Sequence, residues 1–148
     1  MATRSSGKVR LFSGFGAGMV VMAGSLLGTS CSDQVTGPSD LLGGVWKLQS
    51  MEVAGASSPF VPDDPDRFTV AFEAGGRLGV VADCNSCGGS YTLDGEALTV
   101  PPMACTLALC ATPSGGEFAS LIQGNASIDL DGDTLEIVSP GGRLALVR

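Results

Sequence analysis

The stretch DCNSCGGSYTLDGEALTVPPMACTLALC, from Asp83 to Cys110, decides how this chain folds. It holds four of the five cysteines, two neighbouring glycines and an Asp-Gly pair between two short apolar segments. An Asp-Gly pair in such a position is typical of a tight turn between antiparallel strands. The stretch therefore predicts a β structure whose neighbouring segments are joined through cysteine chemistry.

The four cysteines form two close pairs, Cys84-x2-Cys87 and Cys105-x4-Cys110. Their spacing is compatible with a four-cysteine zinc site, a thioredoxin-like C-x-x-C redox motif or two structural disulfides. A redox cysteine usually starts a helix, which lowers its pKa, whereas strand-like residues follow Cys87. Thiols of exported proteins oxidise, so the export signal described below favours two disulfides.

The sequence leaves the pairing of these cysteines open. Antiparallel segments on either side of a turn favour the nested pairs Cys84–Cys110 and Cys87–Cys105. A register counted outward from Asp94-Gly95 instead places Cys84 opposite Cys105, but Pro101-Pro102 interrupts that count, because proline cannot donate to a β ladder. The nested pairing is the preferred interpretation.

Residues 1–30 have the layout of an export signal. Three basic residues precede an uncharged apolar run over residues 11–27, and small residues then lead to Cys31. This layout resembles a bacterial lipoprotein signal, in which the cysteine is lipidated and becomes the new N-terminus. Gly28 stands where that pattern usually has leucine, so ordinary cleavage before Cys31 and an uncleaved membrane anchor remain as alternatives.

The cysteine count supports lipidation of Cys31. Five cysteines would leave one thiol unpaired in an exported protein, whereas lipid on Cys31 leaves four that can pair fully. We therefore predict a membrane partner reached through an N-terminal lipid such as palmitate, in the cell envelope, at the outer membrane facing the periplasm. Residues 31–40 are polar and contain a Gly-Pro step, which predicts a flexible tether.

Composition excludes several classes of function. The chain has no histidine, so a Ser-His-Asp or Cys-His site cannot be built. From Cys31 onward there are 5 basic and 15 acidic residues, a net charge of −10. Such a surface repels nucleic acid and keeps a domain soluble. We predict no nucleic-acid partner, no cofactor and no metal.

Residues 41–148 predict a mainly β domain of the α+β type. Runs such as Phe68-Thr69-Val70-Ala71-Phe72 alternate apolar and polar or small residues, which is typical of half-buried strands. Phe118, Leu121 and Ile122 follow helical spacing within residues 116–123, with Ser114 or Gly115 as the expected cap. The expected strands are residues 45–51, 68–72, 77–82, 89–93, 97–100, 127–130, 134–138 and 143–147.

About eight short antiparallel strands are expected to curl into a half-barrel with the one helix packed on it. Trp46 is interpreted as a core residue rather than a ligand platform, since it lies on an alternating strand. The segment Asp129 to Asp133 lacks the glycine and glutamate positions of a calcium loop, which favours a hairpin turn. The expected core is Trp46, Phe68, Phe72, Phe118, Leu121, Ile128 and Leu135.

Three segments of this chain resemble the META domain, also called HslJ-like. They are a W-x-L start at Trp46, the string DCNSCGGSY from Asp83 to Tyr91, and the string MACTLALC from Met103 to Cys110. The family pattern has G-C-N-x-x-x-G-x-Y in the middle and S-T-x-x-A-C later. The matching residues are Cys84, Asn85, Gly89, Tyr91, Thr106 and Cys110, and the departures are Asp83 for Gly, Leu109 for Ala, and the extra pair Cys87 and Cys105.

The resemblance implies a small antiparallel β domain with a helix, of a kind common in bacterial envelope lipoproteins. It also implies a bridge between Cys84 and Cys110, and the extra pair Cys87 and Cys105 suggests a second bridge beside it. Some members of the family are linked to heat shock or antibiotic tolerance, and the family has no established catalytic residues. A role in stress tolerance is therefore an expectation of the resemblance alone.

Together these features predict a non-enzymatic envelope lipoprotein that binds or supports another envelope component, with an envelope protein as its partner. Two alternatives remain open. A half-barrel could carry a lipid or another small apolar ligand in its interior. Paired carboxylates could instead catalyse hydrolysis, although the acidic residues lie mainly in segments that read as turns.

Overall fold

Ten strands form one antiparallel sheet in the computed structural model, which describes residues 39–148. The predicted signal peptide, Cys31 and most of the tether lie outside the described residues. The strands are β1 (Val45–Val53), β2 (Phe68–Glu73), β3 (Arg77–Ala82), β4 (Asn85–Ser90), β5 (Thr92–Asp94), β6 (Ala97–Val100), β7 (Ala104–Cys105), β8 (Gly124–Asp131), β9 (Thr134–Ser139) and β10 (Gly142–Val147).

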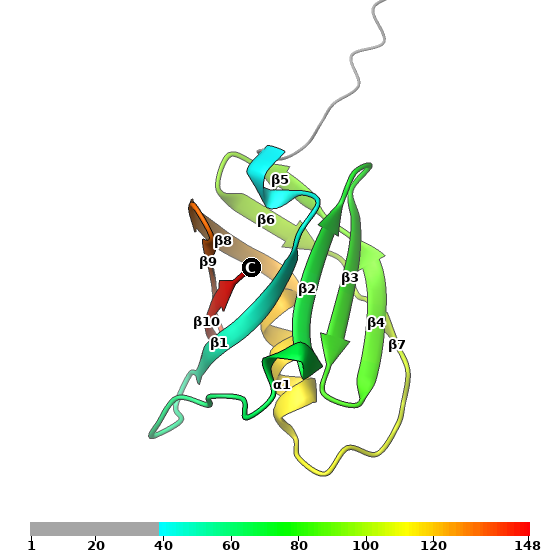
Figure 1. The fold of residues 1–148 in the computed structure, drawn as a ribbon, viewed down its shortest axis with the longest axis vertical. Coiled ribbons are helices and arrows are strands. Elements are labelled where there is room, and N and C mark those ends of the chain that lie inside the picture. Colours follow the sequence, from blue (N-terminus) through cyan, green and yellow to red (C-terminus); the bar gives the residue numbers. More distant parts are fainter. Residues whose placement is uncertain (1–38) are drawn as a thin grey trace, which may run out of the picture. The chain divides into compact units, whose positions relative to one another are not determined.

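The order of strands shows that the sheet curls. Neighbours follow the order β5-β6-β8-β9-β10-β1-β2-β3-β4-β7. Only Tyr91 separates β4 from β5 along the chain, yet these strands lie near opposite ends of the sheet. A flat sheet would hold its two ends many strand widths apart. The sheet must therefore bend until its ends meet near Tyr91, which confirms the predicted half-barrel with one helix (Figure 1).

The helix α1 (Ser114–Ile122) closes the curled sheet and completes the core. It packs against β3, β8, β9 and β10, and Figure 1 shows it across the lower part of the sheet. Phe118, Leu121 and Ile122 are buried, as their helical spacing predicted. All seven residues expected in the core are at most 5% exposed. Alternation and helical spacing thus located the interior correctly.

Trp46 is a core residue, as its strand pattern predicted. Its side chain is fully buried, and the indole Nε1 donates a hydrogen bond to the Leu41 carbonyl oxygen at 3.1 Å. The Arg148 guanidinium lies 4.9 Å from the ring centroid. The tryptophan therefore fastens the 3-10 turn η1 (Ser39–Leu41) and the C-terminal residue to the sheet.

The sheet has ten strands where about eight were expected, and two local predictions were wrong. Residues 89–93 do not form one strand, because the chain crosses from one end of the sheet to the other at Tyr91. Neither Ser114 nor Gly115 caps the helix: both lie buried inside α1, and Pro113 stands at the cap without a side-chain hydrogen bond. Within the described residues no helix is long and apolar enough to cross a membrane.

Candidate functional site

The β3–β4 hairpin carries the first half of the site. Ala82 pairs with Asn85, so Asp83 and Cys84 form the two-residue turn between the strands. Asp83 has φ of 60°, in the left-handed region that glycine adopts without cost and that aspartate tolerates better than most residues. This backbone requirement explains why glycine suits the position. The turn places Cys84 where strands β3 and β4 meet.

Two nested disulfides join this hairpin to the segment that follows β6. Cys87 on β4 lies directly opposite Cys105 on β7, and the two are bonded. Cys84 in the turn is bonded to Cys110, five residues beyond Cys105. The pairing is nested because β4 and β7 run antiparallel as direct neighbours.

The register counted from Asp94-Gly95 was wrong. That turn joins β5 to β6, and this hairpin lies at the other end of the sheet from β7. The segments that carry the cysteines are therefore not the two arms of that hairpin. The C-x-x-C cysteines are likewise bonded to other partners and not to each other, unlike the pair of a thioredoxin-like motif.

Asn85 is the polar centre of the site. Its amide nitrogen donates to the Ala108 carbonyl oxygen at 3.1 Å, and its amide oxygen accepts from the Ala108 N–H at 2.8 Å. The same oxygen accepts from the Thr106 hydroxyl at 2.9 Å. Thr106 in turn accepts from the Ser86 N–H at 3.0 Å. One side chain thus fixes the backbone of residues 106–108 against β4.

Asp83 is buried and fully engaged with protein groups. Its side chain is 5% exposed and forms an ion pair with Arg67, which is itself half exposed. The Thr112 hydroxyl donates to the second carboxylate oxygen at 3.4 Å. Because a buried carboxylate needs such partners to offset lost hydration, Asp83 serves to hold the turn in place. Arg67 and Thr112 had no distinguishing pattern in the sequence.

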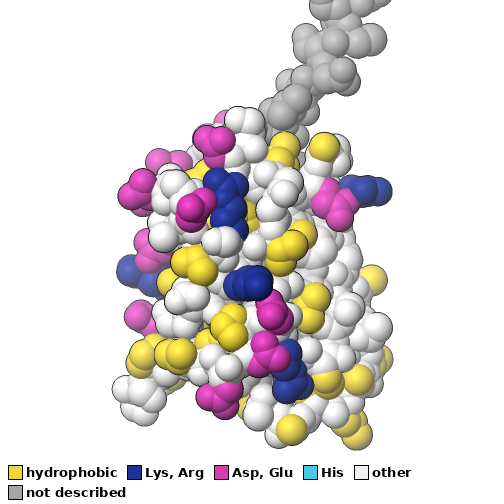
Figure 2. All heavy atoms as spheres, in the orientation of Figure 1, with side chains coloured by type: hydrophobic (Ala, Val, Ile, Leu, Met, Phe, Trp, Pro, Cys, Tyr) yellow, Lys and Arg dark blue, Asp and Glu magenta, His cyan; other side chains and the backbone are white. Residues whose placement is uncertain are grey.

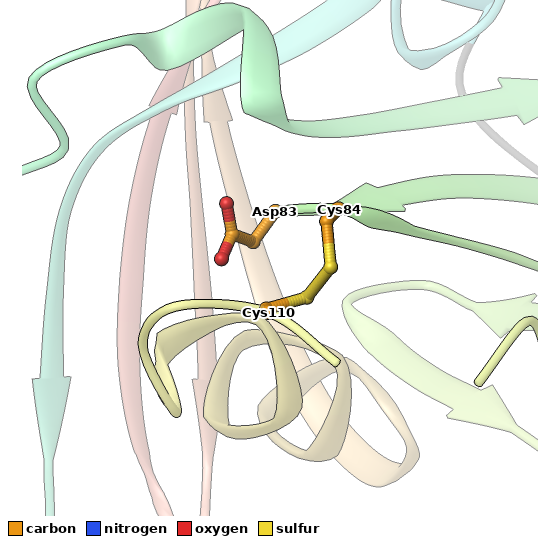
Figure 3. Close-up of side chains that lie close together, drawn as sticks. All are labelled: Asp83, Cys84 and Cys110. Carbon is orange, nitrogen blue, oxygen red and sulfur yellow. A yellow bond between two sulfur atoms is a disulfide. The ribbon is translucent and has the colours of Figure 1, made fainter. Parts of the chain in front are cut away.

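Asp83, Cys84 and Cys110 place their side-chain ligand atoms within 4.8 Å of one another. Metal binding at this cluster would need free thiolates, but the two sulfur atoms are bonded to each other. Figure 3 shows the Asp83 carboxylate directed away from that disulfide. The arrangement supports a structural role for the cluster and gives no support to the zinc interpretation.

The space around the site does not suit a buried ligand. A surface hollow of about 150 Å³ lies beside Asp83, and Phe60 and Phe68 are among the residues that line it. This volume is below the range of typical ligand pockets. The interior of the half-barrel is filled by large buried side chains, among them Trp46, Phe72 and Phe118. The structure therefore lends no support to carriage of an apolar ligand in the interior.

The acidic turn at Asp131–Asp133 is the hairpin between β8 and β9, as its sequence predicted. Asp133 accepts a hydrogen bond from the Arg148 Nε at 3.0 Å. Glu73 and Glu136 likewise form ion pairs with arginines. Carboxylates with these partners stabilise strand ends and turns, and they offer no paired acid and base for hydrolysis.

A family model for the META domain matches residues 39–148. The chain belongs to the META domain family. No curated protein matches it. An NMR structure aligns with a TM-score of 0.55 at 23% identity and covers 70% of this chain and 86% of the other. These alignment values show a shared fold.

Two further solved structures share the fold of this META domain. An NMR structure of a Burkholderia xenovorans protein has a TM-score of 0.57 at 18% identity, covering 73% of this chain and 83% of that one. A crystal structure of a DUF4847 family protein from Bacteroides vulgatus has a TM-score of 0.51 at 15% identity, covering 70% and 91%. At these identities the likeness concerns the fold alone.

The structure explains the residues that carry the META pattern. Cys84 is bonded to Cys110, and Asn85 is hydrogen-bonded to Thr106. Tyr91 packs edge-on against Phe72, and its hydroxyl reaches the Glu73 carbonyl oxygen at 3.4 Å. Burial raises the pKa of Tyr91 above its ordinary value. Cys84, Asn85, Thr106 and Cys110 therefore bind one another and set the geometry of the segment that follows β7, whereas Tyr91 packs into the core.

Proposed function

We propose that this META domain is a non-enzymatic binding or supporting module of the bacterial cell envelope, held at a membrane by lipid on Cys31. The observation that carries the proposal is the pairing of four cysteines in two disulfides. Stable disulfides belong to oxidising compartments outside the cytoplasm. With four cysteines paired, Cys31 is the one left for lipidation, and it follows a lipoprotein-like signal.

The fold and the family support a binding role over catalysis. Neither META nor DUF4847 is a known enzyme family. The polar residues of the site are occupied by contacts with one another, so they stabilise a surface instead of attacking a substrate. We propose the periplasmic face of the outer membrane as the location and another envelope component as the partner, with stress tolerance as the process served.

Intact mass spectrometry of protein purified from bacterial membranes tests the anchor. The expected species starts at Cys31, carries acyl chains and shows no alkylatable thiol before reduction and four after it. A Cys31→Ser variant should lack the acyl mass, while both disulfides remain. A wild-type protein that is soluble and unacylated would contradict the lipoprotein proposal.

A further inference from the structure

Two leucines project from the segment that the disulfides and Asn85 hold in place. Leu107 is 95% exposed and Leu109 is 102% exposed, whereas the other exposed large hydrophobic residues of the described region range from 37% to 64%. Single exposed apolar residues are common on proteins. Two such residues at alternate positions of a fastened segment form a feature that a partner can recognise. We call residues 106–110 the leucine edge.

The leucine edge is held at both ends and in the middle. Cys105 precedes it and Cys110 ends it, and both are bonded to the β3–β4 hairpin. The Asn85 side chain is hydrogen-bonded to both the N–H and the carbonyl oxygen of Ala108, which lies between the two leucines. Since the exposed conformation is already fixed, binding there loses little further conformational entropy.

The leucine edge follows β7 directly, and one backbone hydrogen bond and the Asn85 side chain hold it beside β4. Thr106 donates its N–H to the Ser86 carbonyl oxygen, and Ala108 is bonded to Asn85, so these residues face β4. Leu107 and Leu109 alternate with them, and their backbone groups make no hydrogen bond to other described residues. The unpaired groups of Leu107 and Leu109 are therefore available to a neighbouring strand.

Charge narrows the choice of partner. No charged residue occurs from residue 97 to residue 116, although the part of the chain after Cys31 carries a net charge of −10. Figure 2 shows hydrophobic and uncharged side chains along the lower right edge of the molecule, while most of the acidic side chains on this face lie on its left half and in its centre. A partner that binds here is recognised through apolar contact and backbone pairing.

Two other occupants fit less well. A stable protein interface buries about 800 Å² on each partner, and two leucine side chains cover only a small part of such an area, so these leucines alone do not support a second copy of this chain. A bilayer would strip water from the unpaired backbone groups and supply no hydrogen-bond partners.

The leucine edge and the start of the described chain lie toward opposite ends of the domain. The described chain begins at η1, at one end of the domain, and the segment between β7 and α1 runs toward the opposite end (Figure 1). We propose that the leucine edge binds an extended, apolar segment of another envelope polypeptide, which adds as a strand beside residues 106–110. This inference rests on the proposed envelope role and names the class of partner.

Selection of random peptides displayed on phage against the purified protein tests the inference. We expect enriched peptides with alternating apolar residues, and binding at least tenfold weaker to the variant L107S/L109S. Val61→Ser is the matched control, because Val61 is also exposed, at 64%, but lies outside the leucine edge. Failure to enrich any peptide, or equal binding to L107S/L109S, would overturn the proposal.

Two further measurements separate strand addition from simple apolar contact. Hydrogen exchange at the amides of Leu107 and Leu109 should slow on binding of a selected peptide, and N-methylation of alternate peptide amides should abolish binding. Retained binding of the N-methylated peptide would refute backbone pairing. Leucine-dependent binding of phosphatidylcholine vesicles without peptide binding, or dimerisation lost in L107S/L109S, would assign the surface to lipid or to a second copy. The Cys31 mass measurement is independent of all these results, so the two proposals fail separately.

Discussion

Replacing the cysteines in pairs gives a quantitative test of the nested disulfides. Three variants are needed: Cys84→Ala with Cys110→Ala, Cys87→Ala with Cys105→Ala, and all four together. The bonded pairs are 26 and 18 residues apart, and the inner loop lies wholly within the outer one. In the unfolded chain, each bridge therefore shortens the loop that the other one closes.

The chain-entropy model converts this nesting into free energies. The outer bridge alone closes 26 residues, which is worth about 3.5 kcal/mol. The two separations differ by eight residues, so with one bridge present the other closes only a ring of that size, worth about 2.5 kcal/mol. Removing either pair should lower the free energy of unfolding by about 2.5 kcal/mol, and removing both by about 6 kcal/mol.

Urea unfolding without reductant measures these differences, and the m-value should rise as bridges are removed because the unfolded chain expands. The Cys84–Cys110 pair is the cleaner of the two, since Cys87 is buried and its replacement also disturbs packing. Local pairs, Cys84–Cys87 and Cys105–Cys110, would together supply only about 3.7 kcal/mol, additively. A four-alanine variant that loses less than about 4 kcal/mol would refute the nested arrangement.

Three further changes have definite expected outcomes. Asn85→Ala should lower the free energy of unfolding by about 1.5–3 kcal/mol, because three hydrogen bonds to oxygen or backbone groups are lost. In urea unfolding, the double variant with Asn85→Ala and Thr106→Val should lose less free energy of unfolding than the sum of the losses in the two single variants, because the two side chains share a hydrogen bond. Strict additivity of the two losses would disprove that coupling. Gly115→Ala should cost about 2 kcal/mol, because a Cβ there would lie 2.5 Å from the Ala82 carbonyl oxygen. Its control, Gly116→Ala, has nothing within 4 Å and should stabilise the helix by up to about 1 kcal/mol, so equal melting temperatures would contradict the close packing. Burial raises the pKa of Tyr91, so this residue's contribution is intact below its ordinary pKa and is lost as pH rises through the higher folded-state value. When the free energy of unfolding is measured against pH, Tyr91→Phe should reduce its fall at alkaline pH. An unchanged slope would assign that fall to other groups.

Alternation predicted most of the sheet because one face of each strand is buried. Phe68, Val70 and Phe72 all point into the core, and β2 lies within one residue of its expected bounds. The same rule fails at β4, where Gly88 and Gly89 offer no side chain to alternate. It also fails at Tyr91, where the chain crosses from one end of the curled sheet to the other, because such a crossing leaves no pattern in the neighbouring residues. Pairing across the sheet is decided by such distant contacts.

The candidate site was predictable in its covalent part only. An antiparallel arrangement of the cysteine segments favoured the nested pairs that the structure contains, although these segments belong to β4 and β7 and are not the arms of the Asp94-Gly95 turn from which the arrangement was inferred. The role of Asn85 was less visible, since its partners lie 21 to 23 residues away. The exposure of Leu107 and Leu109 had no signal, because leucine is usually buried and nothing local marks an exception.

The internal contacts of the META motif locate where binding specificity can reside. Cys84 and Cys110 are bonded to each other, and Asn85 is hydrogen-bonded to Thr106 and Ala108. Polar groups that are satisfied within the protein have little left to offer a ligand. If the domain binds a partner as we propose, its selectivity lies in the side chains that these contacts display. Leu109 stands where the family pattern has alanine, so a fixed support can present different side chains in different META domains. On this reasoning, exchanging Leu109 for alanine changes the choice of bound segment without changing the fold.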